Sequence, residues 1–473
     1  MQQQTIGFLA LGAYCFFASV LGAAFARLHL TLSFLNFPIF IGEGLMLFCL
    51  GIACWSVYIE QNRLSNQQRL FLAYLGFIAL WAGYDYCKSG GSPLALRNGE
   101  LFFYPVFAFF AYIFYRPSFF SQKTVQVLLA LLLIVSCMVG GVPGFFFIYF
   151  ILFFAVLFAM FSAPWKYLFS SVALLLWPYS LFFSGARTWL VSSVLSGLFL
   201  IFLFLRYFIN LNKMGKFLSG VVAVAVLLGM AFHFADKNGL RTLTTPVQIV
   251  RDYRRVENLI RQESPSFHPQ ILQVYSYNHY HVQGGLEVLF KKNFKKEYTA
   301  KNEKVISRNL QTAYNDILFR LLIWQDMLQE LWENKSVFGV GLSHPQRSKS
   351  IEILNWASSE WENVGWITPH NSFLDMIYRA GLIGGSVIFV IFRILFELIR
   401  DFVGARSVTG VLLSGIIVYG LISANFLLIL ELPYYAIPFW CIFGVTMAYR
   451  RQLLLVEKIR PKRIVDSQRH MGL

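Results

Sequence analysis

The sequence predicts an all-α membrane protein in which about twelve helices cross the bilayer. Of its 473 residues, 57% are hydrophobic and 18% aromatic, whereas only 14% carry a charge. Apolar runs of about 20 residues recur along the chain, and a helix of that length spans the hydrocarbon core of a membrane. One long polar stretch, residues 236–369, interrupts these runs. We therefore expect a multi-span protein with one large, mainly helical external loop.

The apolar runs define nine predicted spans before the polar stretch and three after it. They cover residues 5–26, 34–58, 69–87, 94–115, 124–140, 143–162, 165–183, 186–209, 216–235, 370–395, 408–430 and 433–450. The predicted domains are a membrane part, a loop domain, a second membrane part and a basic tail, at 1–235, 236–369, 370–450 and 451–473. We interpret Met1–Ala26 as a retained helix and not as a signal peptide, because it lacks a basic N-terminal region.

The basic residues orient these spans. Lys and Arg number 40 against 24 Asp and Glu, which gives a net charge of +16. With the N-terminus inside, most cations of the short loops and of the C-terminal tail lie on the cytoplasmic side, as the positive-inside rule requires. The charge therefore indicates cations retained at a membrane face, and we expect membrane lipids and no nucleic acid as partners. The same orientation places residues 236–369 outside.

Cysteine and histidine positions give no support for a metal site. All six cysteines lie within or at the ends of apolar segments, at positions 15, 49, 54, 87, 137 and 441. This distribution predicts neither a disulfide framework nor a zinc site. His279 and His281 alternate on an expected strand, but no third ligand accompanies them. No Asp-x-Asp motif is present to hold a nucleotide sugar through a metal, and we predict no metal and no cofactor.

The ionisable residues of the predicted spans are distributed on one side of the membrane. In this orientation they fall in the outer half or at the outer rim: Glu43, Asp85, Arg97, Glu100, Arg187, His370, Asp375, Arg379 and Glu431. Such groups are costly within a bilayer and mark functional sites. A transporter would instead hold polar groups near the midplane, in two halves that repeat each other. The pattern favours an outward-facing cavity for a lipid-linked substrate with an anionic headgroup.

Two arginines are candidates for binding that anion. Arg187 lies at the outer turn between two spans, where the alternative is a solvated flanking charge. Arg320 interrupts the apolar side of a helix predicted over 305–332, and a charge there requires a partner such as a substrate anion or a buried acid. A guanidinium binds phosphate oxygens with two parallel N–H donors. Gly339-Val340-Gly341 follows this helix as a turn.

The polar stretch ends where an apolar helix is predicted to begin. Pro369 suits a helix start, and we expect His370 and Asn371 in the first turn, where free N–H groups favour an anion. Histidine exchanges a proton near neutral pH, although an interfacial histidine that only forms hydrogen bonds is the alternative. Asp375 and Arg379 follow at i, i+4 spacing and are expected to pair.

Three motifs, in this order, resemble those of the O-antigen ligase and O-antigen polymerase superfamily of bacterial envelope proteins. They are Ser184-Gly185-Ala186-Arg187-Thr188, Arg320-Leu321-Leu322-Ile323-Trp324 leading to Gly339-Val340-Gly341, and Pro369-His370-Asn371-Ser372-Phe373-Leu374 with Gly381-Leu382-Ile383-Gly384. The number of spans and the large external loop before His370 also agree with this superfamily.

The resemblance implies a metal-independent, inverting glycosyltransferase in the bacterial inner membrane, with its active site facing the periplasm. The donor would be a glycan on undecaprenyl diphosphate. Arg187 and Arg320 would bind the diphosphate and stabilise its charge as it leaves, and His370 would take the proton from the acceptor hydroxyl. To these we add Arg97 as a further phosphate ligand, and three supporting residues, Asn371, Asp375 and Arg379.

The acceptor is less well defined than the donor. A ligase of this superfamily transfers the glycan to lipid A-core, a polymerase transfers it to another lipid-linked repeat, and a related branch glycosylates proteins. We expect O-antigen ligation, with polysaccharide polymerisation as the alternative. A lipid-linked glycan transporter or flippase, or a non-catalytic scaffold for envelope assembly, would be an alternative of another class.

Overall fold

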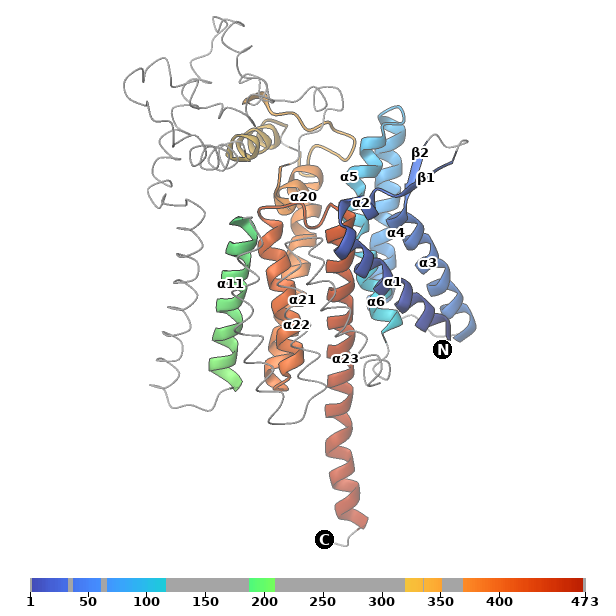
Figure 1. Cartoon of the computed structure of the whole chain (residues 1–473), viewed down its shortest axis with the longest axis vertical. Helices are drawn as coiled ribbons and strands as arrows, with labels where there is room; N and C mark the ends of the chain where they lie inside the picture. Colours follow the sequence, from blue (N-terminus) through green and yellow to red (C-terminus); the bar gives the residue numbers. More distant parts are fainter. Residues whose placement is uncertain are drawn as a thin grey trace, which may run out of the picture.

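The computed structural model describes residues 2–32, 37–60, 66–115, 187–208, 320–334, 336–350 and 369–470. The predicted spans at 124–140, 143–162, 165–183 and 216–235 lie outside these residues, as do His279, His281 and most of the 236–369 loop domain. The described residues form a bundle of long helices, consistent with the predicted all-α membrane class, and one short hairpin is added to it (Figure 1).

The N-terminal part of the bundle consists of six helices and the hairpin. The helices are α1 (Gln2–Leu21), α2 (Ala23–Ala26), α3 (Ile41–Glu60), α4 (Asn66–Lys88), α5 (Pro93–Phe103) and α6 (Val106–Phe114). Between α2 and α3, β1 (His29–Leu32) and β2 (Phe37–Phe40) pair antiparallel, with His29 opposite Phe40. The prediction of one continuous span over 34–58 is therefore wrong at its start. Pro38 lacks the N–H that a helix interior requires, but a strand at the edge of a two-stranded sheet accepts it.

The span predicted at 94–115 is also interrupted. Its first part, α5, ends at Phe103, and α6 begins at Val106. Pro105 lies between them and cannot donate the backbone hydrogen bond that would continue the helix. The two short helices that result place the polar residues of α5 at one end of the bundle, separate from the apolar α6.

The C-terminal part contains α11 (Arg187–Leu203), the π-helix η2 (Phe204–Phe208), α20 (Ser372–Ala380), α21 (Leu382–Gly404), α22 (Val408–Ala424) and α23 (Pro433–His470). In the described part of the chain, two helices are long and apolar enough to cross a membrane, at Gln4–Leu21 and Leu382–Gly404. The predicted span at 370–395 is therefore wrong in its bounds, because Gly381 separates α20 from α21. Beyond the bundle, α23 continues as a single helix into the region predicted as a basic tail (Figure 1).

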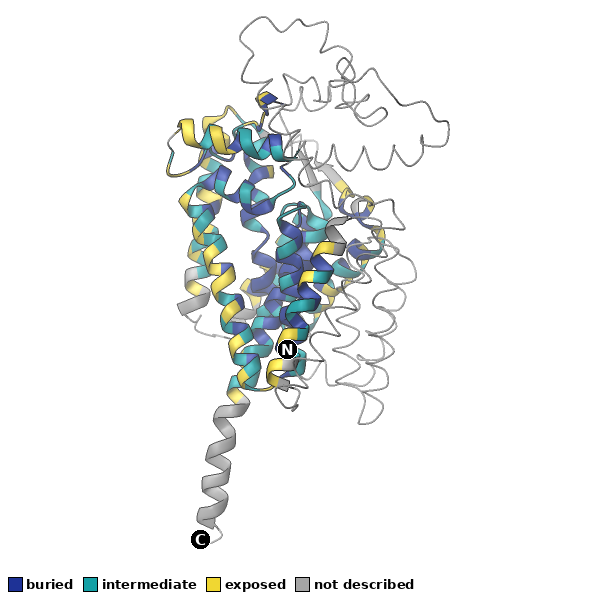
Figure 2. Cartoon of the chain, turned by 90° about the vertical axis from the view of Figure 1, so that its left-hand side faces the viewer, coloured by how far each residue is buried: buried dark blue, intermediate teal, exposed yellow. Residues whose placement is uncertain are grey.

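Small residues allow the helices of the bundle to approach closely, as is typical of helix pairs in membranes. α23 packs against α6 so tightly that a Cβ at Gly444 would overlap the backbone of Ala108. A Cβ at Gly415 would likewise overlap Leu200, which pairs α22 with α11. Buried residues are concentrated along these inner faces of the bundle (Figure 2).

Glycines of two sequence motifs, at 339–341 and 381–384, allow backbone segments to approach closely at one end of the bundle. The 336–350 segment lies against α20, and the amide N–H of Val340 donates to the carbonyl of Tyr378 at 2.9 Å. At Gly381, where φ is +53°, a Cβ would overlap the carbonyl of Val337, and at Gly384 it would overlap that of Met376. Only glycine therefore permits the turn from α20 into α21 at this distance.

We predict that Gly384→Ala destabilises the protein by about 1–3 kcal/mol, because the added methyl group meets backbone atoms that cannot rotate away. Gly385→Ala is the matched control, since no atom lies within 4 Å of a Cβ there. That change should be neutral or stabilising by up to about 1 kcal/mol, because alanine is the better helix former. Thermal unfolding of both variants in detergent measures the difference. Equal stabilities would show that the contact between α20 and α21 is not close.

Candidate functional site

His370 and Asn371 lie just before α20, and the structure corrects their predicted place in its first turn. Asn371 is the N-cap residue, with an extended backbone, and its Oδ1 accepts a hydrogen bond from the N–H of Leu374 at 3.0 Å. His370 precedes the cap with φ +52°, a left-handed conformation that histidine adopts more readily than most residues. The Asn371 side chain thus binds one of the N–H groups at the helix start that were predicted to be free for an anion. Asn371 thus organises the helix start, and His370 projects from a loop.

The 320–334 helix, which carries Arg320, is hydrogen-bonded to the residues just before α20. The indole Nε1 of Trp324 donates a hydrogen bond to the carbonyl of Pro369 at 2.6 Å, next to His370. Arg320 Nη1 donates to the carbonyl of Phe426 at 2.9 Å. The sequence prediction had expected an anion or an acid as the partner of Arg320, and the structure adds a backbone carbonyl. One helix therefore contacts both the His370 region and the chain that follows α22.

Residues 425–432, the loop that joins α22 to α23, bind both α20 and the 320–334 helix. Ser372, at the start of α20, donates from Oγ to the carbonyl of Leu427 at 3.3 Å and accepts from the N–H of Leu430 at 3.3 Å. Because the adjacent Phe426 binds Arg320, the loop is held simultaneously by α20 and by the 320–334 helix. We name it the 425–432 loop.

Glu431 is the ionisable residue of this loop, close to its C-terminal end. It is hydrogen-bonded to Ser372 and interacts electrostatically with Asp375, Arg379 and Arg97. Burial, and then the neighbouring Asp375, raise the pKa of the Glu431 carboxyl well above its ordinary value, although both arginines oppose the shift. Burial therefore disfavours the ionised form of Glu431. The sequence prediction noted Glu431 at the outer rim and assigned it no role. The sequence feature that could have indicated a role for Glu431 is an acidic residue in a short loop between two apolar spans.

Arg97 reaches the same loop from the N-terminal part of the chain. It lies on α5, and its side chain is exposed. Its electrostatic partners are Glu100, one turn later on the same helix, and Glu431. Because Arg97 and Glu431 are far apart in sequence, their spacing gave no basis for predicting this electrostatic interaction.

Arg187 is the first residue of α11, and the direction of α11 shows which end of the bundle it occupies. The hydroxyl of Tyr419 on α22 is hydrogen-bonded to Ser193, whereas Gly415 lies against Leu200. Residue numbers rise along one helix as they fall along the other, so α11 and α22 are antiparallel. Arg187 lies about 9 Å of helix before Ser193, toward the C-terminal end of α22, where the 425–432 loop begins.

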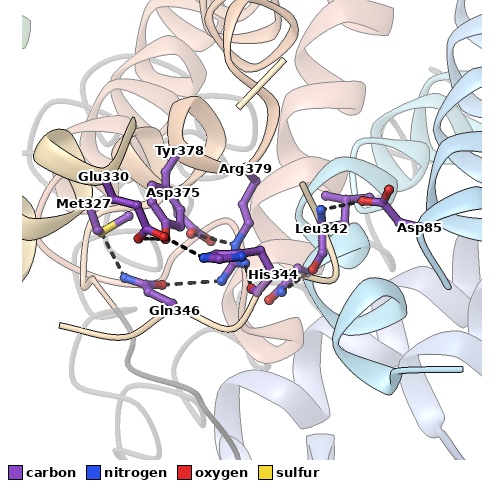
Figure 3. Close-up of polar contacts among 10 residues, drawn as sticks. Asp85, Met327, Glu330, Leu342, His344, Gln346, Asp375, Tyr378 and Arg379 are labelled. Carbon is purple, nitrogen blue, oxygen red and sulfur yellow. Dashed lines mark hydrogen bonds and ion pairs between the residues drawn. The ribbon is translucent and has the colours of Figure 1, made fainter. Parts of the chain in front are cut away.

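The predicted pair of Asp375 and Arg379 is confirmed. Arg379 Nε lies 3.3 Å from Asp375 Oδ1, and the arginine side chain is only 1% exposed. Its guanidinium also donates to the backbone carbonyl of His344 and, at 3.5 Å, to Oε1 of Gln346 (Figure 3). Burial raises the pKa of the Asp375 carboxyl, and Arg379 opposes that shift. The pair therefore supports the site by tying α20 to the 336–350 segment.

The opposite side of the 336–350 segment is anchored to the N-terminal helices. Oδ2 of Asp85 on α4 accepts a hydrogen bond from the N–H of Leu342 at 2.7 Å (Figure 3). Nδ2 of Asn98 on α5 donates to the carbonyl of the same residue at 2.6 Å. Both backbone groups of Leu342 are satisfied, so this extended segment joins α4, α5 and α20 into one support for the site.

The arrangement combines positive charge with a proton acceptor. Arg320 binds the backbone of the 425–432 loop, and Arg97 interacts electrostatically with Glu431 in that loop. α11 begins at Arg187, and His370 lies two residues before Ser372, which also binds the loop. Guanidinium groups bind phosphate oxygens, and a neutral imidazole accepts a proton. Among the residues that the structure describes, no group of three His, Cys, Asp or Glu side chains is placed to hold a metal ion.

Comparison with known proteins gives one match. Residues 170–390 match the family described as O-antigen ligase, a range that includes Arg187, Arg320 and His370. No curated protein and no solved structure matches the chain.

We predict that Arg379→Ala costs about 3–5 kcal/mol of stability, because it removes one partner of a buried ion pair and leaves Asp375 uncompensated. Arg393→Ala is the matched control. Arg393 also forms an i, i+4 pair, with Glu397, but its side chain is 68% exposed. An exposed pair of this kind contributes no more than about 1 kcal/mol. Unfolding of the two purified variants should separate them clearly, and a small loss for Arg379→Ala would contradict the supporting role.

Proposed function

We propose that the chain transfers a glycan from undecaprenyl diphosphate to a sugar hydroxyl, because residues 170–390 match the O-antigen ligase family. The reaction takes place at the periplasmic face of the bacterial inner membrane and inverts the anomeric carbon. The observation that supports this most directly is the pair of contacts made by the 320–334 helix. Trp324 binds beside His370 while Arg320 binds the 425–432 loop, so a cation and a proton acceptor lie on neighbouring elements.

The arginines bind the diphosphate of the donor. Arg320 and Arg187 hold its oxygens, and Arg97 adds a third positive charge from α5. Because negative charge accumulates on the diphosphate as the sugar leaves, these fixed cations stabilise the transition state more than the bound substrate. The raised pKa of Glu431 is important here, because it disfavours an ionised carboxylate that would repel the donor.

His370 is the general base. It takes the proton from the acceptor hydroxyl, whose oxygen then attacks the anomeric carbon from the face opposite the diphosphate. The bond from that carbon to the phosphate oxygen breaks, and the diphosphate leaves with the electron pair. Asn371 places His370 by capping α20, and Asp375 with Arg379 holds α20 in position. No metal or cofactor takes part in these steps.

The acceptor that we favour is lipid A-core, which makes the reaction O-antigen ligation. A polymerase would use the same donor and the same base but would transfer the glycan to a second lipid-linked repeat. The two reactions differ only in the molecule that carries the attacking hydroxyl.

We predict that His370→Ala lowers glycan transfer by about 10²–10⁴-fold, the contribution of a positioned general base. Transfer by the parent protein should also fall as the pH is lowered, because a protonated imidazole accepts no further proton. The measurement is transfer from purified lipid-linked donor in detergent, with the amount of protein in the membrane checked by immunoblot. His29→Ala, on the exposed hairpin, is the control and should keep full activity. Retained transfer by His370→Ala would eliminate the assigned base.

Deletion of the gene should distinguish the two acceptors. If the protein is a ligase, gels of lipopolysaccharide should show lipid A-core without O-antigen, while long glycan accumulates on the lipid carrier. This is the result that we expect. Lipid A-core bearing single repeats would instead identify a polymerase. An unchanged lipopolysaccharide pattern would argue against both activities.

A further inference from the structure

A second group of polar side chains connects three elements at a distance from the 425–432 loop. The hydroxyl of Tyr378 on α20 donates to Oε2 of Glu330 on the 320–334 helix, at 2.5 Å. The other carboxylate oxygen, Oε1, lies 2.7 Å from Nε2 of His344 in the 336–350 segment. Figure 3 shows the three side chains meeting at Glu330. Neither the sequence motifs nor the proposed reaction uses these residues.

The chemistry of the group favours a firm attachment. Burial and the contact with Glu330 raise the pKa of the Tyr378 hydroxyl, so it keeps its proton and remains a donor. A short hydrogen bond from a hydroxyl to a carboxylate is about twice as strong as one between neutral groups. Glu330 and His344 are 30% and 36% exposed, so water reaches their outer edges but does not separate them.

The position of this group along the helix determines what it controls. The 320–334 helix is attached to α20 and the residues before it at two points, through Trp324 to Pro369 and through Glu330 to Tyr378. The two points are about 9 Å apart along the helix axis. The N-terminal part of the helix is also held by Arg320 at Phe426, and its middle is held by Asp326 at Ser348 and Ser350 of the 336–350 segment. The Glu330 contact attaches its C-terminal half directly to α20 and so limits tilting of the helix against α20. Arg320 lies about 6 Å beyond Trp324 and would move with any such tilting.

We propose that Glu330, His344 and Tyr378 are positioning residues that align the Arg320 helix with α20, and so set the placement of Arg320 relative to His370. We call them the Glu330 clasp. The alignment follows from the contacts alone, whereas its catalytic consequence rests on the proposed function. A displacement of about 1 Å in a substrate-binding group costs on the order of 100-fold in rate.

A distance measurement tests the alignment independently of catalysis. Spin labels are placed at the exposed Leu328 and Leu382, in a background where Cys54, Cys87 and Cys137 are serine. The parent should give one narrow distance distribution, and Glu330→Ala and Tyr378→Phe should each broaden it. Their combination should be no broader than Glu330→Ala alone, because Tyr378→Phe removes an interaction that Glu330→Ala already removes. Glu333→Ala is the control, since Glu333 lies on the same helix but pairs with Lys349 in solvent. Its distribution should match that of the parent.

Turnover tests the consequence for the reaction. We expect Glu330→Ala and Tyr378→Phe to lower kcat by about 10–100-fold with little change in the KM for acceptor. Glu330→Gln, whose amide oxygen still accepts from Tyr378, should recover most of the loss, and Glu333→Ala should retain full turnover.

Two results would overturn the clasp: distributions that stay narrow in Glu330→Ala and Tyr378→Phe, or broadened distributions with unchanged turnover. Broadening in the variants of a parent protein that transfers no glycan would instead support the alignment and reject the proposed function.

Discussion

The buried guanidinium of Arg379 is the interaction on which the rest of the site depends. A charge that is only 1% exposed is tolerated only when every side of it is paired, and here Asp375, the carbonyl of His344 and Gln346 surround it. Two of these partners belong to the 336–350 segment. The pairing of Arg379 therefore holds the 336–350 segment against α20. In the same segment, His344 binds Glu330, and Leu342 binds the N-terminal helices.

The docking of these elements in turn positions the candidate reactive groups. His370 lies just before the start of α20, and the 320–334 helix carries Arg320. The alignment of the two helices is set by Trp324 at one point and by Glu330 at another. The 425–432 loop then serves both, because Ser372 and Arg320 bind its backbone. The candidate reactive groups are thus positioned by hydrogen bonds to the backbone and by side chains that take no part in the proposed reaction.

Local rules predicted some parts of this arrangement well and others poorly. The pair of Asp375 and Arg379 was predictable because i, i+4 residues share one face of any helix. The helical conformation of 320–334 was predictable from its apolar spacing. The location of His370 was predicted wrongly. Pro369 was expected to start the helix, but the side chain of Asn371 caps it, so α20 begins after His370. Span bounds failed at Pro38, Pro105 and Gly381, where a long apolar run concealed a change of backbone conformation.

The sequence by itself indicated the membrane class and the motifs that resemble the O-antigen ligase superfamily, a resemblance that the family match confirms. The outward placement of the charges stays a prediction. Composition and residue spacing are properties of the chain alone, so they can be read without coordinates. Only the tertiary structure decided that Arg97 meets Glu431, that Arg320 meets Phe426 and that Glu330 meets Tyr378. Each of these contacts joins residues far apart in sequence, and no local periodicity encodes which distant backbones a glycine or a buried charge will bring together.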